Sequence, residues 1–173
     1  MPAGKRGAAA PAATPTSTPT STSTSTSTST SPSALPIPLQ RSFIDTNILV
    51  YADSADEPAK QQVAIQLLTQ LRLAGLGVIS TQVLNEYCNV ALNKLKRSHA
   101  GLRAQLQFFK QFEVVNVTPE IIEAAVDLHQ TRALSYFDAL MVAAAQTSGC
   151  GVLLSEDMQA GEVVGGVRIL NPF

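Results

Sequence analysis

The sequence is poor in the features that mark secreted and membrane proteins. It has no tryptophan and only two cysteines, and none of its apolar runs reaches the roughly 18 residues that a membrane span needs. Lys5 and Arg6 are not followed by the apolar segment of a secretory signal. Cys88 and Cys150 are far apart and belong to no Cys-x-x-Cys pair. We therefore expect two buried, reduced thiols in a cytoplasmic protein.

The chain also lacks an excess of charge and several well-known site motifs. Its formal charge is −1 and its pI about 6.1, which argues against strong non-specific binding to polyanions but not against a small site that acts on one. There is no P-loop and no Ser-His-Asp pattern. His99 and His129 stand alone, without the spacing of metal ligands. What remains is a chain of 173 residues, 45% hydrophobic, which is enough for one domain with a core.

Residues 1–40 differ in composition from the rest. Alanine, glycine and proline dominate the first part, and residues 16–31 are almost entirely serine and threonine. Such a segment has too few apolar side chains to offset the entropy of ordering, so we predict disorder. It is either a flexible tail or the result of a start codon placed too far upstream over repetitive DNA. We favour the second reading, because nothing in the segment is chemically specific. The folded domain then covers residues 41–173.

Within residues 41–173, short apolar runs alternate with amphipathic segments. The predicted strands cover residues 42–45, 77–79, 113–117, 152–155 and 167–170. The predicted helices begin near Ile48, at Pro58, after an N-cap at Thr81, before Leu102, at Thr118-Pro119, and at Phe137 after Ser135. This alternation predicts an α/β domain with a mainly parallel sheet and helices on both faces.

Two acidic residues lie at the ends of predicted strands. Asp45 ends the first strand, and Asp157 follows the strand at residues 152–155 by two residues. Ligands of parallel α/β sheets bind at the carboxyl ends of the strands, so both carboxylates are candidates for a site. For each of them alone, a role as a turn or cap residue is about as good an explanation.

Glu86 and Asp138 lie on predicted apolar helix faces. Glu86 is three residues after Val83 and four before Val90, whereas an exposed glutamate normally lies on the opposite face. A shifted apolar stripe is the alternative explanation. Asp138 is the one charge in a helix without a polar face, in the first turn, where the helix dipole favours an anion. A capping box with Ser135 would explain its position but not its apolar surroundings.

Together, these carboxylates suggest one acidic pocket. Carboxylates packed that closely repel one another, and some would stay protonated unless a cation were bound. Since the candidate ligands are all oxygens, the expected cation is Mg²⁺ or Mn²⁺ rather than zinc.

Four segments carry a resemblance to a known family. Asp-Thr-Asn-Ile-Leu-Val-Tyr at residues 45–51 resembles the opening motif of PIN-domain nucleases, and residues 135–145 are similar to their buried helix with the third acid. Leu-Leu-Ser-Glu-Asp-Met-Gln-Ala-Gly at residues 153–161 resembles their closing motif, and Asn85-Glu86-Tyr87 fits the intervening glutamate. The order and spacing of these segments agree with the family over residues 42–173. The compact size is most similar to the VapC-type toxins of bacterial toxin–antitoxin pairs.

The resemblance implies a PIN-like three-layer α/β/α domain that acts as a Mg²⁺-dependent endoribonuclease. It implies that Asp45, Glu86, Asp138 and Asp157 are the catalytic, metal-binding quartet, with Asn47 and Ser155 as polar neighbours. Glu156 lies beside Asp157, so the identity of the fourth acid stays open at this point. The family also implies a homodimer, a small antitoxin partner and an RNA substrate, with no role at a membrane.

The basic segment between Tyr87 and Phe112 contains no acid and could contact phosphates. Its candidate RNA-binding residues are Lys94, Lys96 and Arg97. A merely solvated helix face explains this segment equally well. Two other functions remain to be weighed: a non-catalytic PIN-like module that binds RNA or protein, and a nuclease for DNA or structured flaps. All four acids are present, which argues against the first, and the insertions of flap nucleases are missing.

Overall fold

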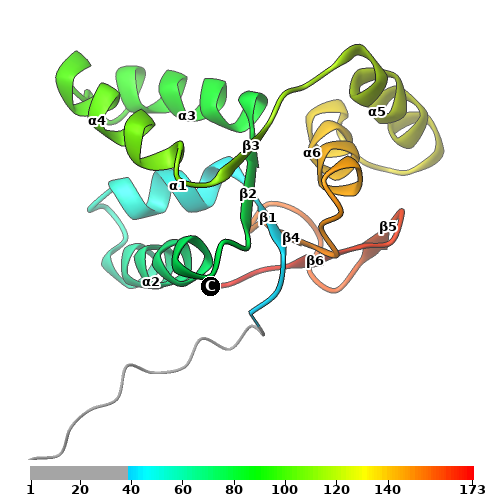
Figure 1. Cartoon of the computed structure of the whole chain (residues 1–173), viewed down its shortest axis with the longest axis horizontal. Helices are drawn as coiled ribbons and strands as arrows, with labels where there is room; N and C mark the ends of the chain where they lie inside the picture. Colours follow the sequence, from blue (N-terminus) through cyan, green and yellow to red (C-terminus); the bar gives the residue numbers. More distant parts are fainter. Residues whose placement is uncertain (1–38) are drawn as a thin grey trace, which may run out of the picture. The chain divides into compact units, whose positions relative to one another are not determined.

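The computed structural model describes residues 39–173, so the expectation for residues 1–40 lies almost wholly outside the described residues. One six-stranded sheet forms the centre, in the order β3-β2-β1-β4-β6-β5 (Figure 1). Its strands are β1 (Ser42–Ile44), β2 (Gly77–Ser80), β3 (Glu113–Val115), β4 (Val152–Leu154), β5 (Val163–Val164) and β6 (Val167–Leu170).

The sheet is mainly parallel, as the sequence predicts. Strand β1 lies between β2 and β4 and runs parallel to both, with Ser42 opposite Gly77 on one side and Val152 on the other. Only β5 is antiparallel, paired with β6. The sequence analysis missed β5 because a strand of two residues leaves no detectable period in the sequence.

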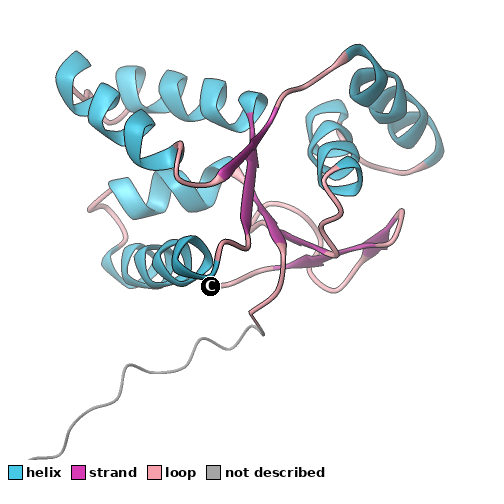
Figure 2. Ribbon diagram, in the orientation of Figure 1, coloured by secondary structure: helices cyan, strands magenta, loops and turns pink. Residues whose placement is uncertain are grey.

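In the described part of the chain, six helices cover the two faces of the sheet. They are α1 (Thr46–Asp53), α2 (Pro58–Ala74), α3 (Thr81–Asn93), α4 (His99–Phe109), α5 (Pro119–Thr131) and α6 (Tyr136–Thr147). Figure 2 shows α1 to α4 on one side of the sheet and α5 and α6 on the other, which confirms the three-layer α/β/α arrangement. Helix α6 packs on the sheet through β1, β2, β4 and β6. It is long and apolar, and Ala139 through Ala145 are all buried.

The central strands are buried on both faces, which explains why they are continuous apolar runs rather than alternating ones. Phe43, Ile44, Leu153 and Leu154 have no exposed surface. Helix α2 ends, as predicted, at Gly75, whose φ of 66° is the left-handed conformation that glycine adopts without strain.

Three details of the prediction were wrong. The N-cap of α3 is Ser80, whose hydroxyl accepts a hydrogen bond from the Val83 amide, whereas the Thr81 hydroxyl accepts one from Val117. The predicted strand ended at Ile79, whereas Ser80 both ends β2 and caps α3. In α5 the sequence predicts a buried stripe of Ile121, Ile122, Ala125, Val126 and Leu128, but only Ile121 and Ala125 are buried, and Ile122 and Val126 are exposed. Phe137, read as part of a helix buried all round, is 59% exposed.

In the described part of the chain, no helix combines the length and the apolar character needed to cross a membrane.

Candidate active site

Asp45 and Asp157 come together because they follow neighbouring parallel strands. Asp45 is the N-cap residue of α1, directly after β1, and Asp157 lies in the turn after β4. The side-chain amide of Asn47 joins them, with Nδ2 2.9 Å from Asp45 Oδ2 and 3.3 Å from Asp157 Oδ2. Ser155 donates its hydroxyl to Asp45 Oδ2 at 2.6 Å and accepts from the backbone amides of Asp157 and Met158. One short network therefore fixes both acids.

Burial makes Asp45 an unusual carboxyl group. It is only 4% exposed, and removal from water raises its pKa from 3.8 to about 6. The hydrogen bonds from the Ser155 hydroxyl and the Thr46 backbone amide lower the pKa, whereas the negative charges of Asp157 and Glu86 raise it. Five contributions thus act on the pKa of one carboxyl group, and desolvation is the largest.

Glu86 reaches the same region from α3. Its Oε2 accepts a hydrogen bond from the Thr46 hydroxyl at 2.7 Å, and its Oε1 accepts one from Gln82 Nε2 at 2.9 Å. Thr46 directly follows Asp45, so the start of α1 positions two acids at once. The shifted stripe considered above does not explain these bonds, because Glu86 is half-buried against a specific donor.

Asp138 lies in the first turn of α6, where the sequence predicts it. The Ser135 hydroxyl accepts from the Asp138 backbone amide at 3.2 Å and donates to Asp138 Oδ2 at 2.7 Å. Ser135 is therefore the N-cap of α6, as its position before the helix predicts. The reciprocal half of a capping box is missing from this pair, because the carboxylate bonds to the hydroxyl of Ser135 rather than to its backbone amide.

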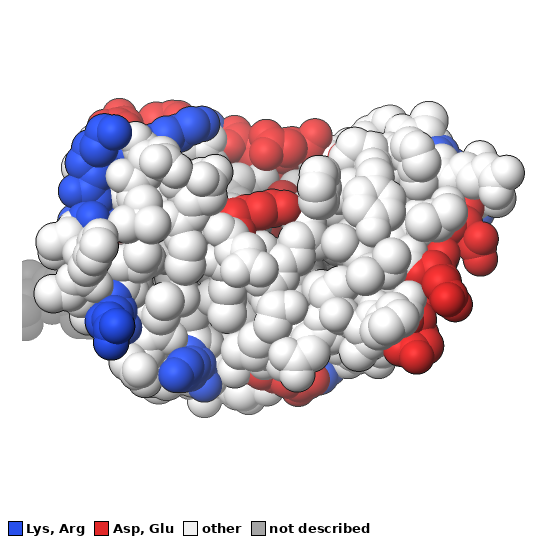
Figure 3. Space-filling model, turned by 90° about the horizontal axis from the view of Figure 1, so that it is seen from above, with Lys and Arg blue, Asp and Glu red and all other residues white. Residues whose placement is uncertain are grey.

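All four acids line one cavity of about 450 Å³. Asp56 and Glu57, which were not among the predicted site residues, also line it, and Lys94 is the one Lys or Arg in its described lining. Figure 3 shows acidic side chains in and beside a central hollow, with Lys and Arg mainly toward the left edge of this face of the molecule. The signal that could have revealed the two further acids is their position in the loop after α1, at the same sheet edge as Asp45.

The donor atoms of this cavity fit a hard divalent cation. They are carboxylate oxygens with hydroxyl and amide neighbours, and the buried Asn47 Oδ1 has no hydrogen-bond partner in the described part of the chain. Within residues 39–173, however, no three acidic, histidine or cysteine side chains are gathered closely enough to hold an ion. Each carboxylate of the set is instead hydrogen-bonded to a neutral neighbour. The chemical type of these donor atoms therefore suits Mg²⁺ or Mn²⁺.

A comparison with protein families decides the identity. The model of the PIN domain matches residues 42–164. This chain belongs to the PIN domain family. The resemblance in the sequence motifs is thereby confirmed over most of the folded part. Comparison with curated proteins gives no significant match.

Several solved structures have a similar fold. A toxin–antitoxin complex from Klebsiella pneumoniae is 22% identical with a TM-score of 0.57, covering 76% of this chain and 98% of that one. DNA-bound VapBC from Salmonella typhimurium is 16% identical with a TM-score of 0.59 and the same coverage of both chains. VapC20 from Mycobacterium tuberculosis, a toxin that cleaves the sarcin–ricin loop, is 21% identical with a TM-score of 0.50, covering 67% and 91%. At these identities the likeness extends to the fold.

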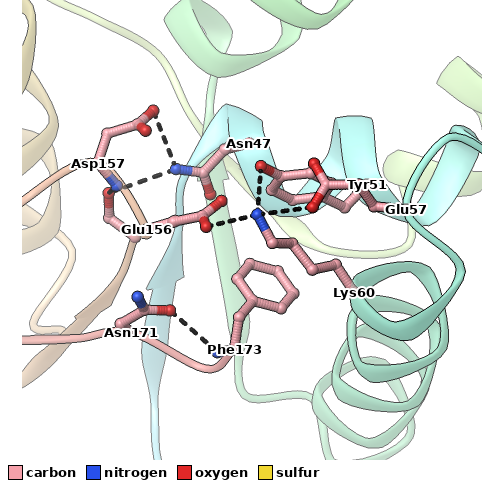
Figure 4. A network of polar contacts seen from close by, with 9 residues as sticks. Asn47, Tyr51, Glu57, Lys60, Glu156, Asp157, Asn171 and Phe173 are labelled. Atoms are coloured by element: carbon pink, nitrogen blue, oxygen red, sulfur yellow. Dashed lines mark hydrogen bonds and ion pairs between the residues drawn. The ribbon is translucent and has the colours of Figure 1, made fainter.

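The two acids that follow β4 in this PIN domain have different surroundings. Glu156 Oε1 lies 2.6 Å from Lys60 Nζ, outside the acidic cavity, whereas Asp157 lines the cavity and contacts Asn47. Figure 4 shows the Lys60 ammonium group between Glu156, Glu57 and the Tyr51 hydroxyl. This ion pair holds the pKa of Glu156 below its ordinary value. Sequence analysis had no signal for Lys60, which comes from a separate helix.

The three basic residues of the predicted RNA-contacting set differ in their positions. Lys94 lines the acidic cavity. Lys96 is exposed and has a φ of 52°, outside the helices. Arg97 forms an ion pair with Asp53, with Nη2 2.6 Å from Oδ1 and Nε 3.0 Å from Oδ2. Asp53 is buried and also accepts from the Tyr87 hydroxyl at 2.8 Å.

Proposed function

We propose that this PIN domain is a divalent-metal-dependent endoribonuclease and the toxin of a toxin–antitoxin pair. The single observation that supports it best is the convergence of four carboxylates from β1, α3, α6 and the turn after β4 on one cavity. Fold maintenance alone does not account for a buried Asp45 with a raised pKa beside two further negative charges.

Asp45, Glu86, Asp138 and Asp157 would hold one or two Mg²⁺ or Mn²⁺ ions. When bound, such an ion supplies positive charge for the scissile phosphate and lowers the pKa of a coordinated water. The protein's contribution is to orient the carboxylates. Ser155 and Asn47 orient Asp45, and Thr46 orients Glu86.

The reaction is hydrolysis of an RNA phosphodiester. A water oxygen forms a bond to phosphorus, the bond from phosphorus to the 3′ oxygen breaks, and one carboxylate of the quartet accepts the proton of the water. The leaving oxygen takes a proton and becomes a 3′-hydroxyl, and the other product carries a 5′-phosphate. A cavity lined by six acids and one lysine repels the RNA backbone, so bound cations strengthen RNA binding, and the chemistry requires the metal.

The toxin assignment rests on the similar structures. They include toxin–antitoxin complexes and a toxin that cleaves the sarcin–ricin loop, each spanning at least 67% of this chain. We accordingly propose an antitoxin that covers the acidic cavity, and a homodimeric toxin in the cytoplasm. Lys94, Lys96 and Arg97 are the proposed RNA-contacting side chains at the α3–α4 corner, and Lys94 has the most direct access to the site.

Cleavage of total RNA by the purified protein tests the proposal. In Mg²⁺, the wild-type protein is expected to produce fragments with 5′-phosphates, and Asp138→Asn is expected to lose this activity while its melting temperature stays that of a folded protein. Asp127→Asn is the matched control, because Asp127 is an exposed acid on α5. Equal cleavage by Asp138→Asn and Asp127→Asn would refute the catalytic role. Absence of cleavage by the wild type on every RNA class would favour the non-catalytic module.

A further inference from the structure

A second hollow of about 400 Å³ adjoins the acidic cavity. Its lining residues are Thr81, Gln82, Asn85, Glu86, Val117 and Phe137. Glu86 and Phe137 also line the acidic cavity, so the two spaces share a wall. A strand of RNA with its scissile phosphate at the acids therefore places a neighbouring nucleotide at this hollow.

Phe137 presents an aromatic ring to this hollow. The ring belongs to a side chain that is 59% exposed, although Ala139 through Ala145 in the same helix are all buried. The only aromatic ring packed against it in the described chain is Tyr136, in an edge-on contact with centroids 5.5 Å apart. An exposed aromatic surface costs free energy in water, and the faces of nucleobases stack on such rings.

Gln82 lines the same hollow, and its side-chain amide includes an acceptor without a partner in the described part of the chain. The residue is only 8% exposed. Its Nε2 lies 2.9 Å from Glu86 Oε1 and 3.4 Å from the Phe137 carbonyl oxygen, and these two acceptors fix which end of the amide is the nitrogen. The opposite end, Oε1, is buried and has no partner in the described part of the chain. A buried carbonyl oxygen without a partner is costly, so a ligand that donates a hydrogen bond to it gains affinity.

We propose that this hollow binds the nucleobase next to the scissile phosphate. The base stacks on Phe137, and an N–H on its edge donates to Gln82 Oε1. Within residues 39–173 no Lys or Arg lines the hollow, so a base rather than a phosphate is the matching group. The proposal rests on the proposed ribonuclease function and assigns part of its sequence preference to Phe137 and Gln82.

Stacking is tested first without cleavage. Short single-stranded RNAs carrying 2-aminopurine at successive positions are titrated into Asp45→Asn protein, alone or combined with Phe137→Ala, Phe137→Tyr or Leu73→Ala. Leu73 is the control, because it is 72% exposed and lies on α2, away from the site. We expect fluorescence quenching at one position, lost only with Phe137→Ala, whose affinity falls roughly 5- to 100-fold. Equal affinity and quenching in the Phe137→Ala and Leu73→Ala proteins would overturn the proposal.

Cleavage of a randomised RNA library gives the second readout. Phe137→Ala is expected to raise KM with little change in kcat, and to flatten the base preference at one nucleotide beside the cut. Gln82→Met is expected to change the preference at that same nucleotide. Unchanged base preference in both variants would contradict the subsite. So would a Phe137→Ala protein that cleaves RNA like the wild type and has lost only its inhibition by a protein partner. If the wild type cuts no RNA but quenching depends on Phe137, the subsite stands and the ribonuclease proposal fails.

Discussion

Lys60 Nζ lies 2.6 Å from Glu156 Oε1, and this ion pair holds the residue next to Asp157 outside the acidic cavity. The ammonium group also lies 4.6 Å from the centre of the Tyr51 ring and 5.9 Å from that of Phe173. The turn after β4, the first two helices and the C-terminal residue thus meet at one lysine (Figure 4). We infer that Asp157, rather than Glu156, is the fourth acid.

The two neighbouring acids can be separated by mutation. Asp157→Asn is expected to reduce RNA cleavage about 100-fold or more, the typical loss when one group that stabilises charge in the transition state is removed. Glu156→Gln weakens a partly exposed ion pair, so it should cost about 1 kcal/mol of stability at most and leave cleavage within a few-fold of wild type. Initial rates at saturating Mg²⁺ measure both effects. A larger loss of cleavage in Glu156→Gln than in Asp157→Asn would make Glu156 the fourth acid of the quartet.

Asp45 is expected to reduce the stability of the metal-free protein. Its pKa is raised from 3.8 to about 6 in the folded state, so the folded state binds the proton more tightly than the unfolded state. Below about pH 4 the group is protonated in both states and costs nothing. From about pH 4 to 6 stability falls as the pH rises, and above pH 6 the cost is constant at about 3 kcal/mol.

Asp45→Asn should therefore stabilise the protein at pH 8 in a chelator, by up to about 3 kcal/mol, while it abolishes cleavage. Denaturant unfolding at pH 4 and pH 8 measures the gain, which should be small at pH 4. Asp127→Asn serves as the control, since it removes an exposed charge. A variant that is less stable than the wild type at pH 8 would show that Asp45 has a structural role.

Arg97 is expected to matter for stability because it neutralises a buried carboxylate. Arg97→Ala leaves Asp53 with fewer partners, and we expect a loss of about 2–4 kcal/mol, below the cost for a fully buried pair because Arg97 is 43% exposed. Arg103→Ala, an exposed arginine on α4, should change stability little. RNA affinity measured at a temperature where both variants are folded separates the roles. A large loss of affinity with normal stability would make Arg97 an RNA contact.

Lys94 is expected to contact the RNA backbone at the edge of the acidic cavity. Lys94→Ala should weaken RNA binding for all sequences alike and reduce the slope of log Kd against log salt concentration by about one. Arg168→Ala on β6 is the charge-matched control, because its exposed side chain is not part of the cavity lining. Titrations over a range of salt concentrations give both slopes. Identical slopes for Lys94→Ala and wild type would remove Lys94 from the interface.

The sequence predicts the layers and the acid positions because both follow from strong local signals. Asp45 and Asp157 follow apolar strands, and parallel strands bring their carboxyl ends to one edge. Asp138 follows its N-cap serine by three residues. These signals depend on neighbours in the chain and on a topology with few alternatives.

The rest depends on contacts between residues far apart in the chain. The Lys60–Glu156 pair joins residues 96 positions apart, and the Arg97–Asp53 pair joins residues 44 apart. Neither pair leaves a pattern in the sequence, so Arg97 was read only as a candidate RNA contact. Phe137 was missed for another reason. It lies in the first turn of an apolar helix. Only the packing shows that the Phe137 side chain in this turn is exposed, whereas the middle of α6 is buried.

Cleavage as a function of free Mg²⁺ tests the central claim most directly. Wild-type protein is first freed of metal with a chelator, and cleavage of one RNA substrate is then followed while Mg²⁺ or Mn²⁺ is added. The account predicts no cleavage in the chelator, recovery that saturates with added ion, and a parallel rise in melting temperature that Asp45→Asn lacks. Cleavage that persists undiminished in the chelator, with no stabilisation by either ion, would contradict a four-carboxylate metal site.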